Sequence, residues 1–232
     1  MVRELPKAET HVWRFPLTSQ GINDLNHLTP EEVAFSAKFA FPHLQEFWIL
    51  GRQSVRRILS LYLDCRPEEI IFLSGPQGKP YLKDFPNLHF NFSNSGEWGV
   101  IALTRDREIG VDIEKVDSNL DIDEVSQVSL TETERRHLSI VPPSEKSSWF
   151  FKYWTVKEAV LKALGTGLSL EPTRLCLSLE KSKPEMLWIE GQENVTTAWD
   201  LKPLSLPEGY FGFVAIEQKA LHVKEFEWPF AV

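Results

Sequence analysis

Apolar and polar residues alternate in short runs over much of the chain, a pattern that favours β-strands with two differently exposed faces. Runs of this kind predict strands over 11–17, 69–73, 88–92, 98–103 and 109–116. The stretch from residue 168 to residue 227 also divides into short apolar runs. We therefore expect that stretch to be mainly β as well.

Helix signals interrupt these strands at three places. Thr29 and Pro30 open the first helix, because threonine caps a helix well and proline suits its first position. We expect this helix over 31–39 and, after a break at the next proline, a second helix over 43–62, where apolar residues recur at helical spacing. The longest helix is predicted over 145–164.

Because strands and helices occur in both halves of the chain, the sequence predicts an α+β fold. The length of 232 residues suits one large domain or two small ones. Polar, turn-like residues at 105–108 mark a seam. We therefore expect an N-terminal half over 1–107 and a C-terminal half over 108–232.

Composition and charge argue against some classes of protein. The net charge of −8 argues against a general nucleic-acid-binding protein, which usually carries a basic face. Cys65 and Cys176 lie far apart, with neither a metal-binding spacing nor a disulfide framework, so a reducing compartment fits. The first ten residues lack the apolar run of a signal peptide, and no run of about 18 apolar residues predicts a membrane span. We expect a cytoplasmic protein.

The first candidate for chemistry is Gly110-Val111-Asp112-Ile113-Glu114. On a strand, Val111 and Ile113 would face the core, and Asp112 and Glu114 would project together from the other face. Neighbouring carboxylates repel unless a cation or a proton lies between them, and oxygen ligands of this kind suit Mg²⁺ or Mn²⁺. By itself, the motif is better explained as an amphipathic strand with a hydrated acidic face.

The helix predicted over 145–164 holds a second candidate. Glu158 and Lys162 are four residues apart, so they lie on one helix face. Taken alone, they are better explained as a surface salt bridge worth about 0.2–0.5 kcal/mol. Lys157, on the neighbouring stripe, is better explained as a solvated residue. Gly165 is placed to end this helix.

A third candidate is Phe90-Asn91-Phe92-Ser93-Asn94-Ser95-Gly96, where aromatic and polar residues alternate and then enter a small polar turn. Backbone N–H groups and hydroxyls in such a turn suit a phosphate. In isolation, the segment is better explained as a strand that ends in a turn.

Taken together and in this order, the segments resemble the larger, surfactin-synthetase-activating type of 4′-phosphopantetheinyl transferase. The matching motifs are G-K-P at 78–80, F-N-F-S-N-S-G at 90–96, G-V-D-I-E at 110–114 and W-T-V-K-E-A-V-L-K-A-L-G-T-G-L at 154–168. The resemblance covers residues from about 39 to about 170. It implies a pseudo-dimer of two similar α+β halves, with the active site between them, that acts as a monomer.

The activity implied by the resemblance is the transfer of the 4′-phosphopantetheine group of coenzyme A to a serine of an apo acyl or peptidyl carrier protein. The other product is 3′,5′-ADP. By position, the family implies that Asp112, Glu114 and Glu158 bind Mg²⁺, with Mn²⁺ as an alternative. Glu158 would also be the general base for the carrier serine, and Lys162 would neutralise and protonate the departing 3′,5′-ADP. Such roles suit phosphoryl transfer, which needs mainly positioning and charge neutralisation.

Contacts with coenzyme A are implied by the same resemblance for Arg52, Lys79, Ser93, Asn94 and Lys157. Two departures from the family pattern put the affinity for coenzyme A in doubt. Asn94 stands where the family commonly has a histidine, and it carries no charge. Many relatives have arginines at positions that here hold Gln45, Glu46 and Phe47.

Several alternatives stay open at this point. Arg56 and Arg57 either compensate for the missing arginines or form an ordinary solvated face. The protein could be a non-catalytic homologue that binds a carrier protein or another nucleotide, or an unrelated Mg²⁺-dependent nucleotide hydrolase. Exposed apolar residues within 121–138 are our candidate docking surface for a carrier protein, although Val125 and Val128 are slightly better explained as core residues.

Overall fold

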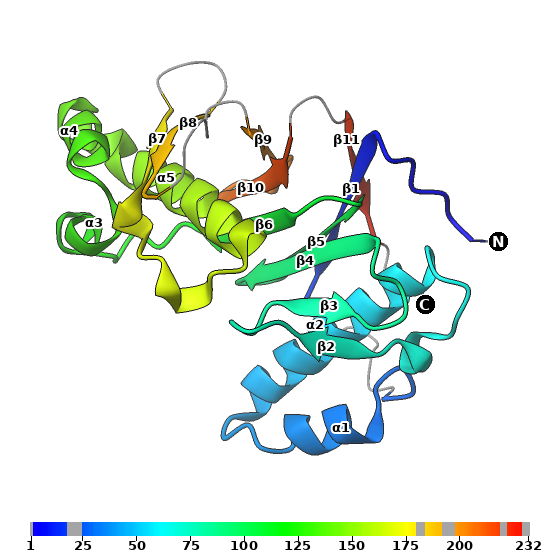
Figure 1. The fold of residues 1–232 in the computed structure, drawn as a ribbon. Helices are drawn as coiled ribbons and strands as arrows, with labels where there is room; N and C mark the ends of the chain where they lie inside the picture. Colours follow the sequence, from blue (N-terminus) through cyan, green and yellow to red (C-terminus); the bar gives the residue numbers. More distant parts are fainter. Residues whose placement is uncertain (1, 18–24, 180–183, 192–197, 219–221, 229–232) are drawn as a thin grey trace.

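A computed structural model describes residues 2–17, 25–179, 184–191, 198–218 and 222–228 of the chain. Its helices and strands form two α+β units that lie side by side (Figure 1). The predicted α+β fold is confirmed. Within the described residues, no helix is both long and apolar enough to cross a lipid bilayer.

Among the described residues, the strands form two main sheets and two small ones. The N-terminal sheet has the order β11-β1-β5-β4, with the bounds His222–Glu227, Glu9–Pro16, Trp98–Arg105 and Leu88–Ser95. The C-terminal sheet has the order β6-β10-β9, with the bounds Ile109–Lys115, Tyr210–Glu217 and Trp199–Pro203. The small sheets pair β2 with β3 and β7 with β8, over Phe72–Ser74, Pro80–Leu82, Leu175–Ser178 and Glu185–Ile189.

The helices agree with most of the signals in the sequence. Their bounds are Pro30–Ser36 for α1, Pro42–Ser60 for α2, Ile122–Ser129 for α3, Glu132–Ile140 for α4 and Pro143–Leu164 for α5. Short 3₁₀ turns lie at Pro67–Glu69, Gly167–Ser169 and Pro172–Arg174. Thr29 caps α1 as predicted, and Gly165, at φ 64°, ends α5. The first helix is shorter than expected, because it ends at Ser36.

One topology occurs twice in the molecule. In the N-terminal half, β1 is followed by the long helix α2, the small sheet β2-β3 and the strands β4 and β5. In the C-terminal half, β6 is followed by α5, the small sheet β7-β8 and the strands β9 and β10. The antiparallel orders β1-β5-β4 and β6-β10-β9 match strand for strand. This repeat is the pair of similar halves that the family resemblance implies.

The last strand corrects the division that we expected at residue 107. β11 pairs in parallel with β1, so residues 222–227 belong to the N-terminal sheet. The ring of Phe226 stacks on that of Trp13 with 4.7 Å between the centroids. This strand covers the edge of β1, which would otherwise present unpaired backbone groups.

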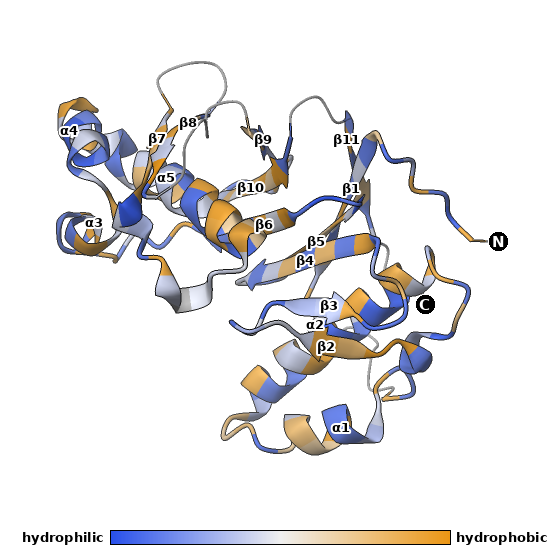
Figure 2. Ribbon diagram, in the orientation of Figure 1, coloured by the Kyte–Doolittle hydropathy of each residue, from blue (hydrophilic) through white to orange (hydrophobic). Residues whose placement is uncertain are grey.

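In the part of the chain that the structure describes, three apolar clusters form the core. One lies between α2 and the N-terminal sheet, and a second surrounds α5. The third joins the two sheets and consists of Val12, Val100, Ala102, Ile109, Val111, Ile113, Val214 and Ile216. Figure 2 shows β6 and the stretch of α5 beside it as mostly hydrophobic. Because the third cluster takes residues from both halves, it holds the two units together.

Candidate functional site

The side chains of β6 alternate between two environments, as predicted. Val111 and Ile113 are fully buried in the cluster between the sheets. Asp112 and Glu114 instead contact groups of β4 and α5. Only 2% of Asp112 is exposed, so the explanation as a hydrated acidic face is wrong.

Gly110 lets helix α5 approach these acids. A Cβ atom on this residue would lie 1.9 Å from the carbonyl oxygen of Ala159 and 2.4 Å from the backbone nitrogen of Ala163. Any side chain here would therefore push α5 away from β6. Glu158 and Lys162 precede these two alanines on α5, so the close contact also places the candidate catalytic residues beside the acids.

Lys162 extends from α5 to β6 and β4. Its Nζ donates to Asp112 Oδ1 at 2.6 Å and to Ser93 Oγ at 2.8 Å. The side chain is 30% exposed, whereas that of Asp112 is almost completely enclosed. Lys162 therefore forms an ion pair across two elements, and its explanation as the partner of Glu158 on a solvated helix face is wrong.

Hydroxyl groups on β4 hold both acids of β6. Ser93 Oγ donates to Asp112 Oδ1 at 2.8 Å, and Ser95 Oγ donates to Glu114 Oε2 at 2.7 Å. Trp154 Nε1, on α5, donates to the other oxygen of Glu114 at 3.4 Å. Strand β4 continues to Ser95, so the polar turn that we expected from Ser93 onward begins later.

The acids share a partly enclosed environment, and this raises the pKa of two of them. Burial raises the pKa of Asp112 to about 6, against the opposing effects of Lys162 and Ser93. Burial also raises the pKa of Glu158, and the charges of Asp112 and Glu114 raise it further. Asp112 Oδ2 is buried and has no hydrogen-bond partner. The three carboxyl groups are therefore near enough to interact through their charges.

These carboxyl groups do not converge on one point. Within the part of the chain that the structure describes, no three His, Cys, Asp or Glu side chains are close enough together to hold a metal ion. Lys162 supplies the counter-charge to Asp112 in this arrangement.

Lys157 lies away from the acids, and its placement corrects the role that we expected. Its side chain is completely buried, with Nζ 2.6 Å from a carboxylate oxygen of Glu134. The same ammonium donates to the carbonyl oxygens of Ser129 and Pro172 at 3.1 and 2.8 Å. Burial lowers the pKa of Lys157, while Glu134 opposes the shift. An ammonium whose three donors are used inside the protein cannot contact a phosphate of coenzyme A, and it is not solvated either.

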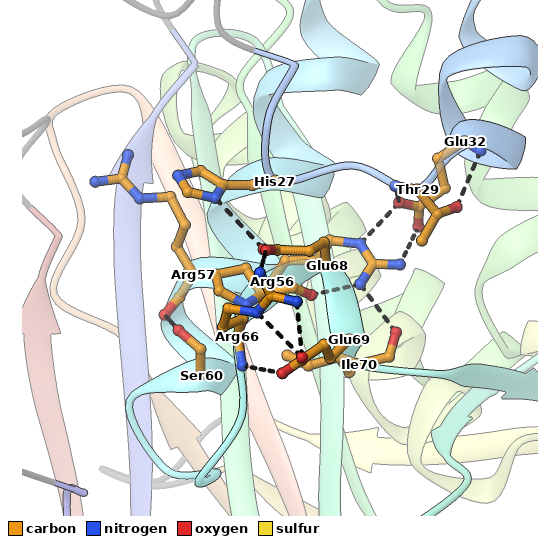
Figure 3. A network of polar contacts seen from close by, with 11 residues as sticks. His27, Thr29, Glu32, Arg56, Arg57, Ser60, Arg66, Glu68, Glu69 and Ile70 are labelled. Carbon is orange, nitrogen blue, oxygen red and sulfur yellow. Dashed lines mark hydrogen bonds and ion pairs between the residues drawn. The ribbon is translucent and has the colours of Figure 1, made fainter.

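The arginines of α2 also have structural partners. Arg56 is buried and donates to the carboxylate of Glu32 and to the carbonyl oxygens of Pro67 and Ile70 (Figure 3). The guanidinium of Arg57 lies 5.4 Å from the ring centroid of Trp228. Arg56 therefore neither compensates for the missing arginines nor belongs to a solvated face. It joins α1 to α2 and to the turn at 67–70.

The remaining predicted contacts of coenzyme A lie at the edges of the N-terminal half. Lys79 Nζ donates to Glu108 Oε2 at 2.6 Å and to the carbonyl oxygen of Ala163 at 2.8 Å, so it ties its loop to the end of α5. Arg52 and Asn94 line a cavity of about 580 Å³ between α2 and β4. The structure thus brings Ser93 to the acids and places these three residues elsewhere.

Two residues of the site were not predicted from the sequence. Ser95 and Trp154 donate to different oxygens of Glu114. A signal for Ser95 existed, because it has the same strand parity as Ser93 on β4. For the tryptophan, the signal was its spacing of one helical turn before Glu158.

The structure has two similar α+β halves, and the acids of β6 and Lys162 lie where these halves meet. Residues 12–106 match the family model described as "4′-phosphopantetheinyl transferase, N-terminal", and residues 108–210 match that of the "4′-phosphopantetheinyl transferase superfamily". The chain belongs to the 4′-phosphopantetheinyl transferase family. It is thus an enzyme of phosphopantetheine transfer from coenzyme A to carrier proteins, and an unrelated nucleotide hydrolase is excluded.

Two relatives in sequence agree with this assignment. The 4′-phosphopantetheinyl transferase HetI of Nostoc sp. is 32% identical over 215 residues, which cover 90% of this chain and 87% of the relative. The 4′-phosphopantetheinyl transferase Sfp of Bacillus subtilis is 31% identical over 146 residues, 63% of this chain and 64% of the relative. The crystal structure of the Thermotoga maritima holo-[acyl-carrier-protein] synthase overlaps with a TM-score of 0.39 at 18% identity, covering 48% of this chain and 63% of that one.

Proposed function

We propose that the residues between β4, β6 and α5 carry out this transfer, with Mg²⁺ as the metal. The observation that supports the proposal best is the contact of Lys162 with both Asp112 and Ser93, which joins the three elements at one place. Phosphoryl transfer depends mainly on positioning and on neutralisation of negative charge. A lysine and several carboxylates at the junction of two halves supply residues for both tasks.

Asp112, Glu114 and Glu158 are the proposed ligands of Mg²⁺, with Mn²⁺ as an alternative, and their carboxylates must move closer together to bind one ion. Carboxylate oxygens are the ligands that both ions prefer. Among the described residues, Asp112 Oδ2 is buried and has no hydrogen-bond partner, which is expected of an oxygen that binds a cation. When bound, the ion would neutralise and orient the pyrophosphate of coenzyme A.

Glu158 is the proposed general base for the carrier serine. Its side chain is only half-buried, so an incoming hydroxyl can approach it. Its raised pKa makes the carboxylate a stronger base than an exposed glutamate. The serine oxygen would attack the β-phosphorus of coenzyme A, and its proton would pass to Glu158.

Lys162 is the proposed partner of the leaving group. Its ammonium already neutralises a carboxylate at 2.6 Å, and its partial exposure leaves it accessible to a ligand. The phosphate oxygen that departs with 3′,5′-ADP gains negative charge as the bond breaks. A nearby ammonium stabilises this charge and can donate a proton to it.

Contacts with coenzyme A are proposed for Arg52, Lys79, Ser93 and Asn94, whereas Lys157 is withdrawn because it is buried against Glu134. Ser93 is the nearest of the four to the acids. A carrier protein as the acceptor follows from the family. The monomeric state and the cytoplasmic location stay predictions, and so does the division of the chain near residue 107 apart from its last strand.

A non-catalytic homologue that binds a carrier protein or another nucleotide is the second candidate. The observation that favours it is the lack of cations at Gln45, Glu46 and Phe47 on α2. The intact set of Asp112, Glu158 and Lys162 favours the active enzyme.

Intact mass spectrometry of a carrier protein tests the proposal. The protein is incubated with coenzyme A, MgCl₂ and an apo carrier from a fatty-acid, polyketide or peptide system. We expect at least one carrier to gain the mass of one phosphopantetheine group, and we expect EDTA to prevent the gain. Binding of coenzyme A without modification of any carrier would support the non-catalytic homologue instead.

A further inference from the structure

A chain of buried polar side chains links β1 to the segment after α2, two strands away from β4 in the N-terminal sheet. Trp13 Nε1 donates to the hydroxyl oxygen of Tyr62 at 2.8 Å, and the same hydroxyl lies 2.8 Å from His11 Nδ1. His11 Nε2 lies 3.0 Å from Glu9 Oε2. Only 3% of His11 and 3% of Tyr62 are exposed. The proposed transfer reaction uses none of these groups.

The hydrogen bonds determine where the protons of this chain lie. A carboxylate only accepts hydrogen bonds, so His11 Nε2 carries the proton that Glu9 receives. An indole N–H only donates, so the Tyr62 oxygen accepts from Trp13, and its own hydrogen is available to His11 Nδ1. A neutral His11 with its proton on Nε2 therefore satisfies all four side chains.

A second proton on His11 would break this pattern. Nδ1 would become a donor, and the Tyr62 oxygen would then receive two N–H groups. The hydroxyl hydrogen of Tyr62 would lose its acceptor, since within the described residues this hydroxyl forms hydrogen bonds with His11 and Trp13 alone. A buried polar group without a partner costs free energy. The buried chain therefore tolerates neutral His11 and not the imidazolium.

Strand β11 lies along β1 and covers His11 (Figure 1). The ring of Phe226 stands edge-on to the imidazole, with 5.0 Å between the centroids. Lys224 donates to Glu9 Oε1 at 2.6 Å, and the guanidinium of Arg3 lies 4.0 Å from the centroid of Phe226. A cavity of about 310 Å³ lies beside these groups, and His11 lines it. Departure of β11 would therefore open the imidazole to water.

We infer that His11 and its hydrogen-bond partners form a pH-sensitive lock on β11, which holds the strand while His11 is neutral and releases it when His11 takes a second proton. Release moves Phe226 and Lys224 away, so that water solvates the imidazolium. Histidine suits such a device because its charge changes near neutral pH. The lock is independent of the proposed transfer reaction, since none of its residues belongs to the site between β4, β6 and α5.

The surroundings of His11 favour its neutral form. Burial lowers the pKa of His11 from its ordinary value of 6.5, Glu9 opposes this shift, and Arg3 and Lys224 add to it. Because the released state binds the second proton more tightly, the hold on β11 is complete above about pH 6.5 and is lost as the pH falls below that value. Glu9 stays ionised at mildly acidic pH, because Lys224 and His11 lower the pKa of its carboxyl from 4.5.

Hydrogen exchange of the backbone amides tests the lock directly. Protection factors are measured by mass spectrometry between about pH 5 and about pH 7.5. We expect those of β11 to fall by roughly three- to ten-fold per pH unit below about 6.5, and those of β10 in the other half to fall less. Unchanged protection of β11 overturns the inference. An equal fall in both strands also overturns it, because that result shows global unfolding and not the release of one strand.

A variant without the titrating ring provides the second test. His11→Gln keeps one donor and one acceptor but cannot take a further proton, so we expect its β11 protection to be independent of pH over the same range. His222→Gln is the matched control, because it removes an exposed histidine of β11 itself and should keep the wild-type pH dependence. A folded His11→Gln protein that still loses β11 protection in acid overturns the inference.

Nitrogen NMR of the wild-type imidazole decides the inference if His11→Gln does not fold. We expect a single ring proton, on Nε2, at neutral pH, and no second proton while β11 stays protected from exchange. A proton on Nδ1 at neutral pH overturns the inference, and so does an imidazolium in a protein whose β11 is still protected.

Discussion

Two adjacent residues of α5 have opposite surroundings, and the surroundings decide what each side chain can do. Lys157 is enclosed by Glu134 and two carbonyl oxygens in the C-terminal core. Glu158 lies near the acids of β6, and burial together with the charges of these acids raises its pKa. A helix turns by about 100° per residue, so one helix supplies a structural cation and a candidate catalytic base from neighbouring positions.

Removal of Lys157 should destabilise the protein and leave substrate binding unchanged. Lys157→Met leaves the Glu134 carboxylate buried without its cation, which typically costs about 3–5 kcal/mol. Lys146→Met on the same helix removes only a surface ion pair with Asp123 and should cost about 1 kcal/mol or less. Urea unfolding measures both costs, and KM for coenzyme A should stay within a few-fold of wild type. A stable Lys157→Met protein with a large increase in KM would contradict the buried role.

Asp112 should make the stability of the metal-free protein fall as the pH rises. The pKa of this carboxyl is about 6 in the folded protein and 3.8 as the reference value. The folded state holds the proton on Asp112 more tightly than the unfolded state does. The contribution of this proton to the stability of the folded protein is therefore complete below about pH 4, and it is lost as the pH rises through about 6.

Urea unfolding in EDTA at several pH values measures this effect. The free energy of unfolding of wild type should fall relative to that of Asp112→Asn between about pH 4 and pH 6, and the two curves should run parallel above that range. Curves that stay parallel throughout would show that the Asp112 carboxyl is not held in its neutral form.

Some residue roles were predictable from the sequence and others were not. Strand alternation correctly placed Val111 and Ile113 in the core. The burial of Lys157 was not predictable, because its partner Glu134 lies on another helix and no local pattern links the two. Val128 shows the same limit, since 74% of it is exposed although we favoured a core position.

At the scale of elements, the contact between α5 and β6 sets the geometry of the site. The backbone of β6 at Gly110 lies against α5 at Ala159 and Ala163. Glu158 and Lys162 reach the acids only because the two backbones are this close. The glycine of the G-V-D-I-E motif is therefore required by packing.

Gly110→Ala should destabilise the protein and disturb the site together. The added methyl group meets backbone atoms that cannot move aside as a side chain can, so we expect a cost of at least about 1–3 kcal/mol. Gly75→Ala is the matched control, because its Cβ would only meet the Lys79 carbonyl oxygen at 3.5 Å. Thermal unfolding and the transfer rate would be measured for both variants. Wild-type stability and rate for Gly110→Ala would refute the close contact.

Element types were predicted better than the partners of each element. The capping residue Thr29 and the terminal Gly165 marked helix ends correctly, because caps are encoded locally. The pairing of β11 with β1 joins residues more than 200 positions apart. No periodicity within either segment specifies which strand it pairs with. We therefore assigned the last strand to the wrong half.

At the scale of the whole molecule, the site depends on the union of the halves. β4 of the N-terminal half supplies the hydroxyls, and β6 and α5 of the C-terminal half supply the acids and the lysine. Side chains also join the strands, since Val111 N donates to Asn91 Oδ1 at 2.9 Å and Lys115 N donates to Ser95 Oγ at 3.0 Å. Neither half alone contains the site.

The two halves should not fold independently when the chain is divided at residue 107. A fragment over 1–107 lacks β11 and exposes its part of the apolar cluster between the sheets. We expect neither this fragment nor 108–232 to unfold cooperatively alone, and we expect a mixture of the two to regain cooperative unfolding by circular dichroism. Cooperative unfolding of the isolated N-terminal fragment would show that the shared cluster is dispensable for it.

The central claim is that Glu158 acts as the base of a transfer reaction at the junction of the halves. Glu158→Gln keeps the shape of the side chain and removes its ability to take a proton. The measurement is the rate at which an apo carrier gains one phosphopantetheine group with coenzyme A and Mg²⁺. We predict a folded variant that binds coenzyme A and leaves the carrier unmodified. Transfer by Glu158→Gln at a rate near that of wild type would contradict the account.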